Sequence, residues 1–360
     1  MTDTRNNLPP AADYEALAAQ IKSWGMELGF QQVGIARAEL DDDEAWLLDW
    51  LAHGYHGDMD YMQRHGTRRS RPPELLPGTV RVISVRMDYW PADATPAESV
   101  LEDPAMAYLS RYAMGRDYHK VLRKRLQQLA DRIEASTGPF IYRAFTDSAP
   151  VLEKALARNA GLGWIGKHTN LINAQAGSWF FLGELYTSLP LPEDMPGDDH
   201  CGTCQSCIDA CPTHAIIAPW KLDARLCISY LTIELRGSIP EHLRPLIGNR
   251  IYGCDDCQLV CPWNRFAGPT DEADFRVRNG LDAASLMELF SWSADEFAER
   301  LQGSPIYRIG HDCWLRNIAV ALGNAPTSHA VIEALNKRKD DASALVREHV
   351  AWALAQHGET

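Results

Sequence analysis

Apolar residues in the first part of the chain recur at the spacing of a helix. Leu17, Ile21, Trp24 and Leu28 repeat every three or four positions, which predicts an amphipathic helix over residues 13–28. We expect a helix-rich first domain to begin with this helix.

Three apolar runs predict buried strands in the same domain. The run VRVISVRM is rich in β-branched residues and follows the turn signal Pro77-Gly78. The predicted strands cover residues 80–87, 139–145 and 178–185, and residues 149–160 between them have a helical pattern. The sequence GLGWIG at residues 161–166 predicts a tight loop. Together these elements predict an α/β domain over residues 1–188.

A segment rich in proline and acidic residues follows this domain. LPLPEDMPGDDH, residues 189–200, marks a linker into a cysteine-rich region. Helical patterns return at residues 281–290, 312–323 and 343–357, and they weakly resemble HEAT-repeat helices. Because so few repeat helices cannot stand alone, we expect them to pack against the rest of the chain. The predicted fold is α+β and multidomain, with domains over residues 1–188, 189–270 and 271–360.

The composition is that of a globular protein, with 46% hydrophobic and 23% charged residues. The sequence has no signal-peptide pattern and no run of about eighteen uncharged apolar residues that could span a membrane. We therefore expect a cytoplasmic protein without a membrane partner. Disulfides are rare in that reducing compartment, so the nine cysteines need another role.

The net charge of -13 argues against a protein that coats nucleic acid through its overall field, but local basic patches remain. Two runs of cations are candidates for phosphate contacts, or for ordinary solvated helix faces. They are Arg64, Arg68, Arg69 and Arg71, and Arg116, Lys120, Arg123, Lys124 and Arg125 opposed by Asp117.

Eight of the nine cysteines lie between residues 201 and 261, in the spacing of iron–sulfur proteins. The first run, C-x-x-C-x-x-C-x-x-x-C-P, is the bacterial ferredoxin motif, in which three thiolates bind one cluster and the fourth binds a neighbouring cluster. The second run, C-x-x-C-x-x-x-C-P, lacks one cysteine, and Cys227 between the runs completes two sets of four. Crossed ligands predict two 4Fe-4S clusters, one on Cys201, Cys204, Cys207 and Cys261 and one on Cys211, Cys227, Cys254 and Cys257.

A pair of zinc sites is the alternative for these cysteines. Zinc ribbons use paired C-x-x-C knuckles, whereas the triple run is hard to wrap around one tetrahedral ion. The ninth cysteine, Cys313, stands alone on an apolar helix face and is expected to be a buried thiol. A ferredoxin needs only the cysteine-rich segment, so the rest of the chain indicates a catalytic partner for the clusters.

Several longer stretches resemble the epoxyqueuosine reductase family over essentially the whole chain. They are TDSAPVLEKALARNAGLGWIGKHTNLIN at residues 146–173, CISYLTIELRG at 227–237 and GNRIYGCDDCQLVCPWN at 248–264, together with the C-terminal helices. The resemblance implies a cobalamin beside the nearer cluster and a first domain related in fold to nitroreductases and reductive dehalogenases. It also implies reduction of the epoxide of epoxyqueuosine, at the wobble position of a tRNA anticodon, in the last step of queuosine synthesis.

The same resemblance assigns roles to individual residues. Asp147 matches the family's proton donor, which would protonate the epoxide oxygen as the C–O bond breaks. Without the resemblance, a cap for the following helix is the simpler interpretation of Asp147. The ordinary pKa of an aspartate is about 3.9, so burial against the corrin would have to raise the pKa of Asp147 for it to donate near neutral pH. The cobalamin contacts implied by the resemblance include Leu171, Leu182, Ser229, Thr232 and Arg236.

The sequence lacks the D-x-H-x-x-G signature of a histidine that ligates cobalt. Its nearest match, Asp117-Tyr118-His119, has Leu122 where the glycine should be. We therefore expect no histidine ligand on cobalt, and we expect His119 and His168 to be polar-core or surface residues.

The expected partners are a tRNA anticodon stem-loop carrying epoxyqueuosine and an external one-electron donor such as flavodoxin or ferredoxin, with the chain acting as a monomer. Loss of the epoxide oxygen as water takes two electrons and two protons, whereas each 4Fe-4S cluster passes one electron at a time. Reduced cobalamin, a strong nucleophile, would carry out the ring opening. Two alternatives stay open here: a reductive dehalogenase-like cobalamin enzyme acting on a small molecule, and a polyferredoxin that only carries electrons.

Overall fold

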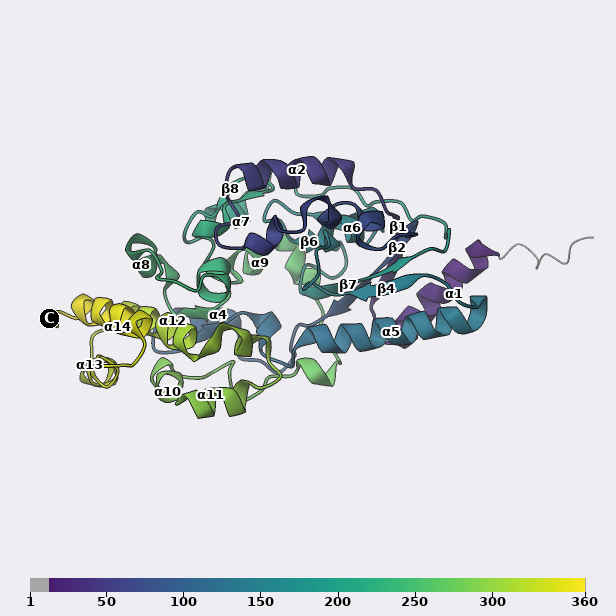
Figure 1. Ribbon diagram of the computed structural model, residues 1–360. Helices are drawn as coiled ribbons and strands as arrows, with labels where there is room; N and C mark the ends of the chain where they lie inside the picture. Colours follow the sequence, from purple (N-terminus) through teal and green to yellow (C-terminus); the bar gives the residue numbers. More distant parts are fainter. Residues whose placement is uncertain (1–12, 360) are drawn as a thin grey trace, which may run out of the picture.

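The computed structural model describes residues 13–359, and its core is a sheet flanked by helices, followed by a cysteine-rich segment and a helical region (Figure 1). The sheet has the strand order β1-β2-β7-β4, and all neighbouring strands are antiparallel. Its strands are β1 (Gln32–Arg37), β2 (Arg81–Asp88), β4 (Tyr142–Phe145) and β7 (Phe180–Thr187). The register pairs Ile35 with Ile83 and Val85 with Gly183.

One face of the sheet is covered by two long helices. They are α1 (Tyr14–Glu27) and α5 (Tyr118–Thr137), which lie along the same side of the sheet in Figure 1. Ile83 and Val85 on β2 and Leu126 on α5 belong to the buried core on this face. Because side chains alternate along a strand, the residues between them face the opposite side.

The opposite face packs against α6 (Glu153–Asn159). Leu156 of α6 joins Val82 and Tyr186 in a second buried core. The end of α6 approaches β1 closely because Gly34 has no side chain, since a Cβ at this position would lie 2.0 Å from the carbonyl oxygen of Ala160. The short pair β5 (Trp164–Ile165) and β6 (Leu171–Ile172) follows α6.

The predicted elements of this domain are present with altered bounds. The strands predicted over 80–87, 139–145 and 178–185 are β2, β4 and β7, and the helix predicted over 13–28 is α1. The helix predicted over 149–160 begins only at Glu153, because the preceding residues form an irregular turn in which Asp147 has a φ of 49°. The loop predicted over 161–166 contains β5. The sequence did not predict β1, α2 (Asp41–Ala52) or α5.

Short elements build the rest of the first domain and the cysteine-rich segment. They are α3 (Pro72–Leu75), α4 (Ala97–Glu102), β3 (Tyr108–Leu109), α7 (Ser206–Asp209), β8 (Ile216–Ala218), β9 (Lys221–Leu222), α8 (Arg244–Ile247), β10 (Arg250–Tyr252) and α9 (Asp256–Leu259). β10 pairs in parallel with β3, which joins this segment to the first domain. α7 packs against α9, so the helices that carry Cys207 and Cys257 are neighbours.

The C-terminal region is helical. Its helices are α10 (Leu286–Ser291), α11 (Ala294–Leu301), α12 (Gly310–Asn324), α13 (His329–Asn336) and α14 (Ala344–Gln356). Trp314 and Cys313 of α12 are buried in a core that also contains Leu109 and Ile251, so the helices pack against the rest of the chain as predicted. The helix predicted over 281–290 begins later, because Ser285 caps its first turn by accepting from the backbone N–H of Glu288. Within residues 13–359, no helix is long and apolar enough to cross a lipid bilayer.

Candidate functional site

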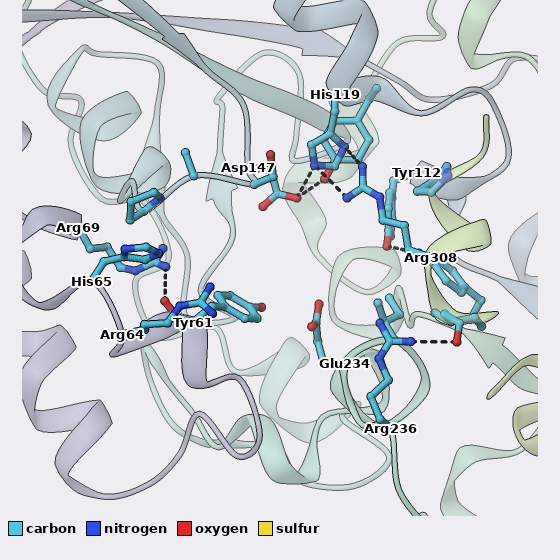
Figure 2. A pocket seen from close by; sticks show the side chains of 18 residues that line it. Tyr61, Arg64, His65, Arg69, Tyr112, His119, Asp147, Glu234, Arg236 and Arg308 are labelled. Carbon is cyan, nitrogen blue, oxygen red and sulfur yellow. Dashed lines mark hydrogen bonds and ion pairs between the residues drawn. The ribbon is translucent and has the colours of Figure 1, made fainter. Parts of the chain in front are cut away.

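Asp147 lies in the turn between β4 and α6, where its carboxylate lines a pocket (Figure 2). Its φ of 49° is uncommon for a residue with a Cβ, so surrounding contacts must hold this conformation. One of them is the backbone N–H of Asp147, which donates to Oε2 of Glu153 at 3.1 Å. The first residue of α6 thus fixes the turn that presents Asp147.

Two side chains at the start of α5 bind the carboxylate of Asp147. Tyr118 donates a hydrogen bond from its hydroxyl to Oδ2, and Nε2 of His119 lies 3.3 Å from the same oxygen. Protein surrounds Asp147, but 52% of its side-chain surface faces the pocket. Burial alone would raise the pKa of Asp147, but the hydrogen bonds from His119 and Tyr118 outweigh it and leave the pKa below its ordinary value. The protein alone therefore does not provide the raised pKa that we expected of a proton donor.

His119 connects Asp147 to a second carboxylate and to the C-terminal region. Nδ1 of His119 lies 2.7 Å from Oδ1 of Asp117, and the other oxygen of Asp117 accepts from Nη2 of Arg308 at 2.8 Å. Arg308 belongs to the 3-10 turn Pro305–Ile309 before α12. Burial would lower the pKa of His119, but the hydrogen bonds to Asp117 and Asp147 outweigh it and raise the pKa.

The pocket in front of Asp147 has a volume of about 420 Å³, which is in the range of small-ligand sites. Segments far apart in the sequence line it, as Figure 2 shows. The lining is mostly aromatic and charged: Tyr61, Tyr112, Tyr118 and Tyr252, Arg64, Arg69, Arg236 and Arg308, and the acids Asp147 and Glu234. Rings and guanidinium groups together suit a planar ligand that carries phosphate.

The two predicted basic patches lie in different surroundings. Arg64 and Arg69 of the first patch line the pocket beside Asp147 (Figure 2). In the second patch, Arg125 pairs with Glu272 and is therefore part of the packing between α5 and a later segment. Lys124 is exposed. The first patch is thus the one that meets the candidate site.

The residues assigned to cobalamin contact are dispersed. Leu171, Leu182, Ser229 and Thr232 lie outside the pocket lining, whereas Arg236 is part of it. Leu171 and Leu182 are buried in one core on the α6 side of the sheet. Thr232 is also buried, and its hydroxyl accepts a hydrogen bond from the backbone N–H of Gly253 at 2.9 Å. All five contacts stay predictions.

Four cysteine thiols surround a small hollow in the cysteine-rich segment. They belong to Cys201, Cys204, Cys207 and Cys261, and the hollow has a volume of about 80 Å³. Burial and the neighbouring thiolates of Cys261 and Cys201 raise the pKa of Cys207 to about 11. Four mutually repelling thiolates are the donor set of an iron–sulfur cluster, whose iron atoms compensate their charge.

His168 lines the same hollow and carries an unpaired donor. Its Nδ1 accepts from the backbone N–H of Asn170 at 3.1 Å, so the proton of the neutral ring is on Nε2. Nε2 is buried and has no hydrogen-bond partner among the described residues. A donor of this kind fits a group that brings its own acceptors, as the sulfur atoms of a cluster do.

The other four thiols of the predicted clusters also lie close to one another. Burial raises the pKa of Cys257, and the thiolate of Cys227 adds to the rise. Burial likewise raises the pKa of Cys227, with a contribution from Cys211, and that of Cys254, with a contribution from Cys227. The charge of Cys227 is thus felt at Cys254 and Cys257, and that of Cys211 at Cys227, while the assignment of the individual ligands stays a prediction.

Lys154 follows Glu153 in α6, and the charges of both Asp147 and the second thiol set act on it. Its Nζ donates to the carbonyl oxygen of Thr169 at 3.1 Å. Burial lowers the pKa of Lys154, while the negative charges of Glu153, Asp147 and Cys257 act in the opposite direction. One side chain thus interacts with both groups, so the second thiol set and the pocket are close neighbours.

Comparison with known proteins identifies the family of this chain. The family model described as epoxyqueuosine reductase QueG, DUF1730, matches residues 69–148, and the 4Fe-4S double cluster binding domain matches residues 200–264. The epoxyqueuosine reductase of Pseudomonas aeruginosa is 62% identical over 99% of this chain and 98% of its own length. The chain belongs to the epoxyqueuosine reductase family. It is therefore an oxidoreductase with a 4Fe-4S domain, which counts against the zinc and polyferredoxin alternatives.

Further members of the epoxyqueuosine reductase family agree. The Escherichia coli enzyme is 57% identical over 96% of this chain and 91% of its own length. The Bacillus subtilis enzyme, solved with a catalytic aspartate loop swung out of the active site, matches with a TM-score of 0.87 at 27% identity, over 95% of this chain and 90% of that one. An epoxyqueuosine reductase solved with a tRNA-Tyr epoxyqueuosine-modified stem-loop matches with a TM-score of 0.86 at 28% identity, over 96% of this chain and 91% of that one. These structures confirm the predicted α+β multidomain fold.

Four residues around Asp147 were not expected there from the sequence. Tyr118 and His119 stand at the start of α5, and the side chain of Asp117 caps this helix by accepting from the backbone N–H of His119. The sequence signal that could have predicted this arrangement is Asp117 two positions before His119, at the start of a helix. Arg308 carried no such signal, because its place beside His119 depends on how the C-terminal region packs.

Proposed function

We propose that this member of the epoxyqueuosine reductase family reduces the epoxide of epoxyqueuosine, at the wobble position of a tRNA anticodon stem-loop, to the cyclopentene of queuosine. This would be the last step of queuosine synthesis. The observation that carries the proposal is the pocket, in which Asp147 lies among aromatic and cationic side chains in a volume of about 420 Å³. An unstacked base and its phosphates need such rings and cations.

The reaction sets a balance of electrons and protons. The epoxide oxygen leaves as water, which takes up two electrons and two protons, and each 4Fe-4S cluster passes one electron at a time. We assign one cluster to Cys201, Cys204, Cys207 and Cys261 and the other to Cys211, Cys227, Cys254 and Cys257. Cys204 is exposed, whereas Cys257 acts on Lys154 beside Asp147. Electrons from an external carrier such as flavodoxin or ferredoxin would thus enter at the first cluster and leave from the second.

Cobalamin is our candidate for the group that receives these electrons, and unpaired buried groups beside α6 fit it. Both carboxyl oxygens of Glu184 on β7 are fully buried without a hydrogen-bond partner in the described part of the chain. Burial and the charges of Glu153 and Asp147 raise the pKa of Glu184, so the group is a neutral acid. The amide side chains of a corrin ring supply donors and acceptors that would pair with it. When bound and reduced, cobalamin supplies the electrons that open the epoxide.

The residues of the pocket would bind the nucleotide and handle the proton. We assign Asp147 to protonate the epoxide oxygen as negative charge develops on it. Arg64 and Arg236 would bind backbone phosphates, and the rings of Tyr61 and Tyr252 would hold the unstacked base.

The partners follow from this role. Phosphate contacts need only local cations, so the net charge of -13 does not oppose tRNA binding. We propose that the chain acts as a monomer in the cytoplasm, with the modified stem-loop as its macromolecular substrate.

The test uses anaerobically reconstituted protein that is then chemically reduced. The proposal expects cobalamin absorption, binding of an epoxyqueuosine-containing stem-loop, and its conversion to queuosine in a single turnover. Cobalamin absorption without stem-loop binding or conversion would support a reductive dehalogenase-like enzyme for a small molecule instead. Absence of both cobalamin absorption and stem-loop binding would support a protein that only carries electrons.

A further inference from the structure

We propose that His119 stores the proton that Asp147 passes to the epoxide oxygen, and that Asp117 and Arg308 hold the imidazole for this transfer. The proposal rests on the proposed function and adds a positioning residue to it. Asp147 remains the group that meets the substrate, and His119 acts through it.

The two ring nitrogens of His119 face two different carboxylates. Nδ1 lies 2.7 Å from Asp117 and Nε2 lies 3.3 Å from Asp147. A neutral imidazole has one N–H and can donate to only one of them, whereas an imidazolium donates to both. His119 is 4% exposed, so water is a poor substitute for either carboxylate. The geometry therefore favours the charged ring, with an N–H directed at Asp147.

The charged and titratable groups around His119 come from four elements. Asp117 and Tyr118 lie on α5 or at its cap, Asp147 lies in the turn before α6, and Arg308 lies in the turn before α12. Glu153, at the start of α6, accepts from the backbone N–H of Asp147, and burial raises the pKa of Glu153 to about 8. With Glu153 protonated near neutral pH and His119 charged, two carboxylates balance two cations. If His119 were neutral, the set would carry a net negative charge in a largely buried site, which is costly.

Asp147 is poorly suited to store the proton itself. Tyr118 and His119 both act as donors to its Oδ2, and donors stabilise the ionised form of a carboxylate. Burial opposes both shifts, yet the hydrogen bonds leave the pKa of Asp147 below its ordinary value and the pKa of His119 above its ordinary value. Near neutral pH the transferable proton is thus on His119, one hydrogen bond away from the group that delivers it.

The proton transfer balances with the electrons supplied through the clusters. As the first C–O bond of the epoxide breaks, its electron pair stays on oxygen, and Asp147 hands that oxygen the Nε2 proton of His119. The imidazole is left neutral and keeps its Nδ1–H on Asp117. Uptake of one proton from solvent restores His119, and a second transfer along the same path lets the oxygen leave as water when the second C–O bond breaks. The two electrons that the external one-electron carrier supplies through the clusters form the second bond of the carbon–carbon double bond, because both C–O pairs leave with the oxygen.

The experiment measures single-turnover conversion of an epoxyqueuosine-containing stem-loop against pH, with reduced holoenzyme. We expect the wild-type rate to fall as the pH rises through the raised pKa of His119. In His119→Gln the rate at neutral pH should drop about tenfold to a hundredfold, and the fall should move to lower pH, since solvent must then protonate Asp147 and the pKa of that carboxyl sets the profile. In Asp117→Asn, which keeps the helix cap, the fall should move to lower pH because one of the two carboxylates that stabilise the imidazolium is lost. His349→Gln, at a buried histidine in α14, is the matched control and should retain the wild-type rate and profile.

A rate for His119→Gln within threefold of wild type, with the same pH profile, would overturn the relay, and so would an unmoved profile in Asp117→Asn. The protonation of His119 is checked independently by ¹⁵N nuclear magnetic resonance of histidine-labelled oxidised protein, and a neutral ring at pH 6.5 would also overturn the proposal. These results differ from failure of the proposed function, in which wild-type protein would not convert the stem-loop at all.

Discussion

Cys261 lines the same hollow as Cys207, although the two residues belong to different cysteine runs. Cys261 follows α9 and Cys207 lies in α7, and the packing of these two short helices brings the runs together. The last thiol of the second run therefore lies beside thiols of the first, which is the arrangement that the predicted crossed ligands of the bacterial ferredoxin kind require.

Cys261→Ser should damage the cluster bound by this hollow and leave the other cluster largely intact. The physical reason is that serine replaces one of its four thiolates, while the set around Cys257 keeps all of its own. Iron analysis and electron paramagnetic resonance of the folded variant measure the two clusters separately. Equal loss of both clusters would contradict the crossed assignment.

His168→Leu should lower the reduction potential of the same cluster. The unpaired Nε2–H beside the thiols would stabilise the more negative, reduced cluster, and leucine removes that donor. A change of about threefold to tenfold in the reduction equilibrium corresponds to up to about 59 mV for one electron. A redox titration followed by electron paramagnetic resonance provides the measurement, with His329→Leu at an exposed position as control. Unchanged potentials with full iron content would rule out the hydrogen bond.

Arg64→Glu should weaken binding of the modified stem-loop, because Arg64 lines the pocket and would contact phosphate. Loss of one phosphate contact lowers the slope of log affinity against log salt by about 0.7 for a single strand and about 0.9 for a duplex. Binding is measured at several salt concentrations, beside Lys339→Glu in the exposed C-terminal region, which makes the same charge change. The same affinity and slope in both variants would assign Arg64 to the solvated surface.

His349 should contribute less to the free energy of unfolding as the pH is lowered from 7.5 to 5.5. Burial lowers the pKa of His349 to about 4, whereas in the unfolded chain it is about 6.5. At His349 the unfolded chain therefore binds more protons than the folded chain in this range, which costs about 1 kcal/mol of stability. Groups with a raised pKa, such as His119, act in the opposite direction, so the measurement is the difference between wild type and His349→Gln in urea unfolding followed by circular dichroism, and this difference should change by about 1 kcal/mol between pH 7.5 and 5.5. A pH effect of the same size in this variant would show that His349 does not contribute.

Local signals predicted much of the fold. A β-branched run predicted β2, an apolar run predicted β7, and helical spacing predicted α1 and α12. Cysteine spacing predicted two ligand sets, and the four thiols of one set line a common hollow. Each of these signals is written within a short stretch of sequence. The strand β1 was not predicted because QVGIAR is short and contains a glycine. The helix α5 was not predicted because its cations were interpreted as a basic patch and not as the polar face of a helix.

The surroundings of Asp147 could not be predicted in the same way. The positive φ of Asp147 and its contact with His119 depend on how β4, α5 and α6 pack, and Arg308 arrives from a distant segment. The rise in the pKa of Asp147 was expected from burial against the corrin and stays a prediction, whereas in the protein alone the two donors at the start of α5 hold that pKa below its ordinary value. The sequence motif thus identified Asp147 as the candidate acid, whereas tertiary packing sets the pKa of its carboxyl group.

The central claim is that Asp147 delivers the proton to the epoxide oxygen, and Asp147→Asn tests it most directly. The amide preserves the shape of the side chain but has no carboxyl proton, so both clusters and cobalamin should remain bound. General acid catalysis is typically worth about a hundredfold to ten-thousandfold, which is about 3 to 5 kcal/mol of barrier. The measurement is single-turnover conversion of an epoxyqueuosine-containing stem-loop by chemically reduced enzyme, after iron and cobalamin have been quantified. A loss of at least about a hundredfold is the predicted result, and a rate within threefold of wild type would contradict the account.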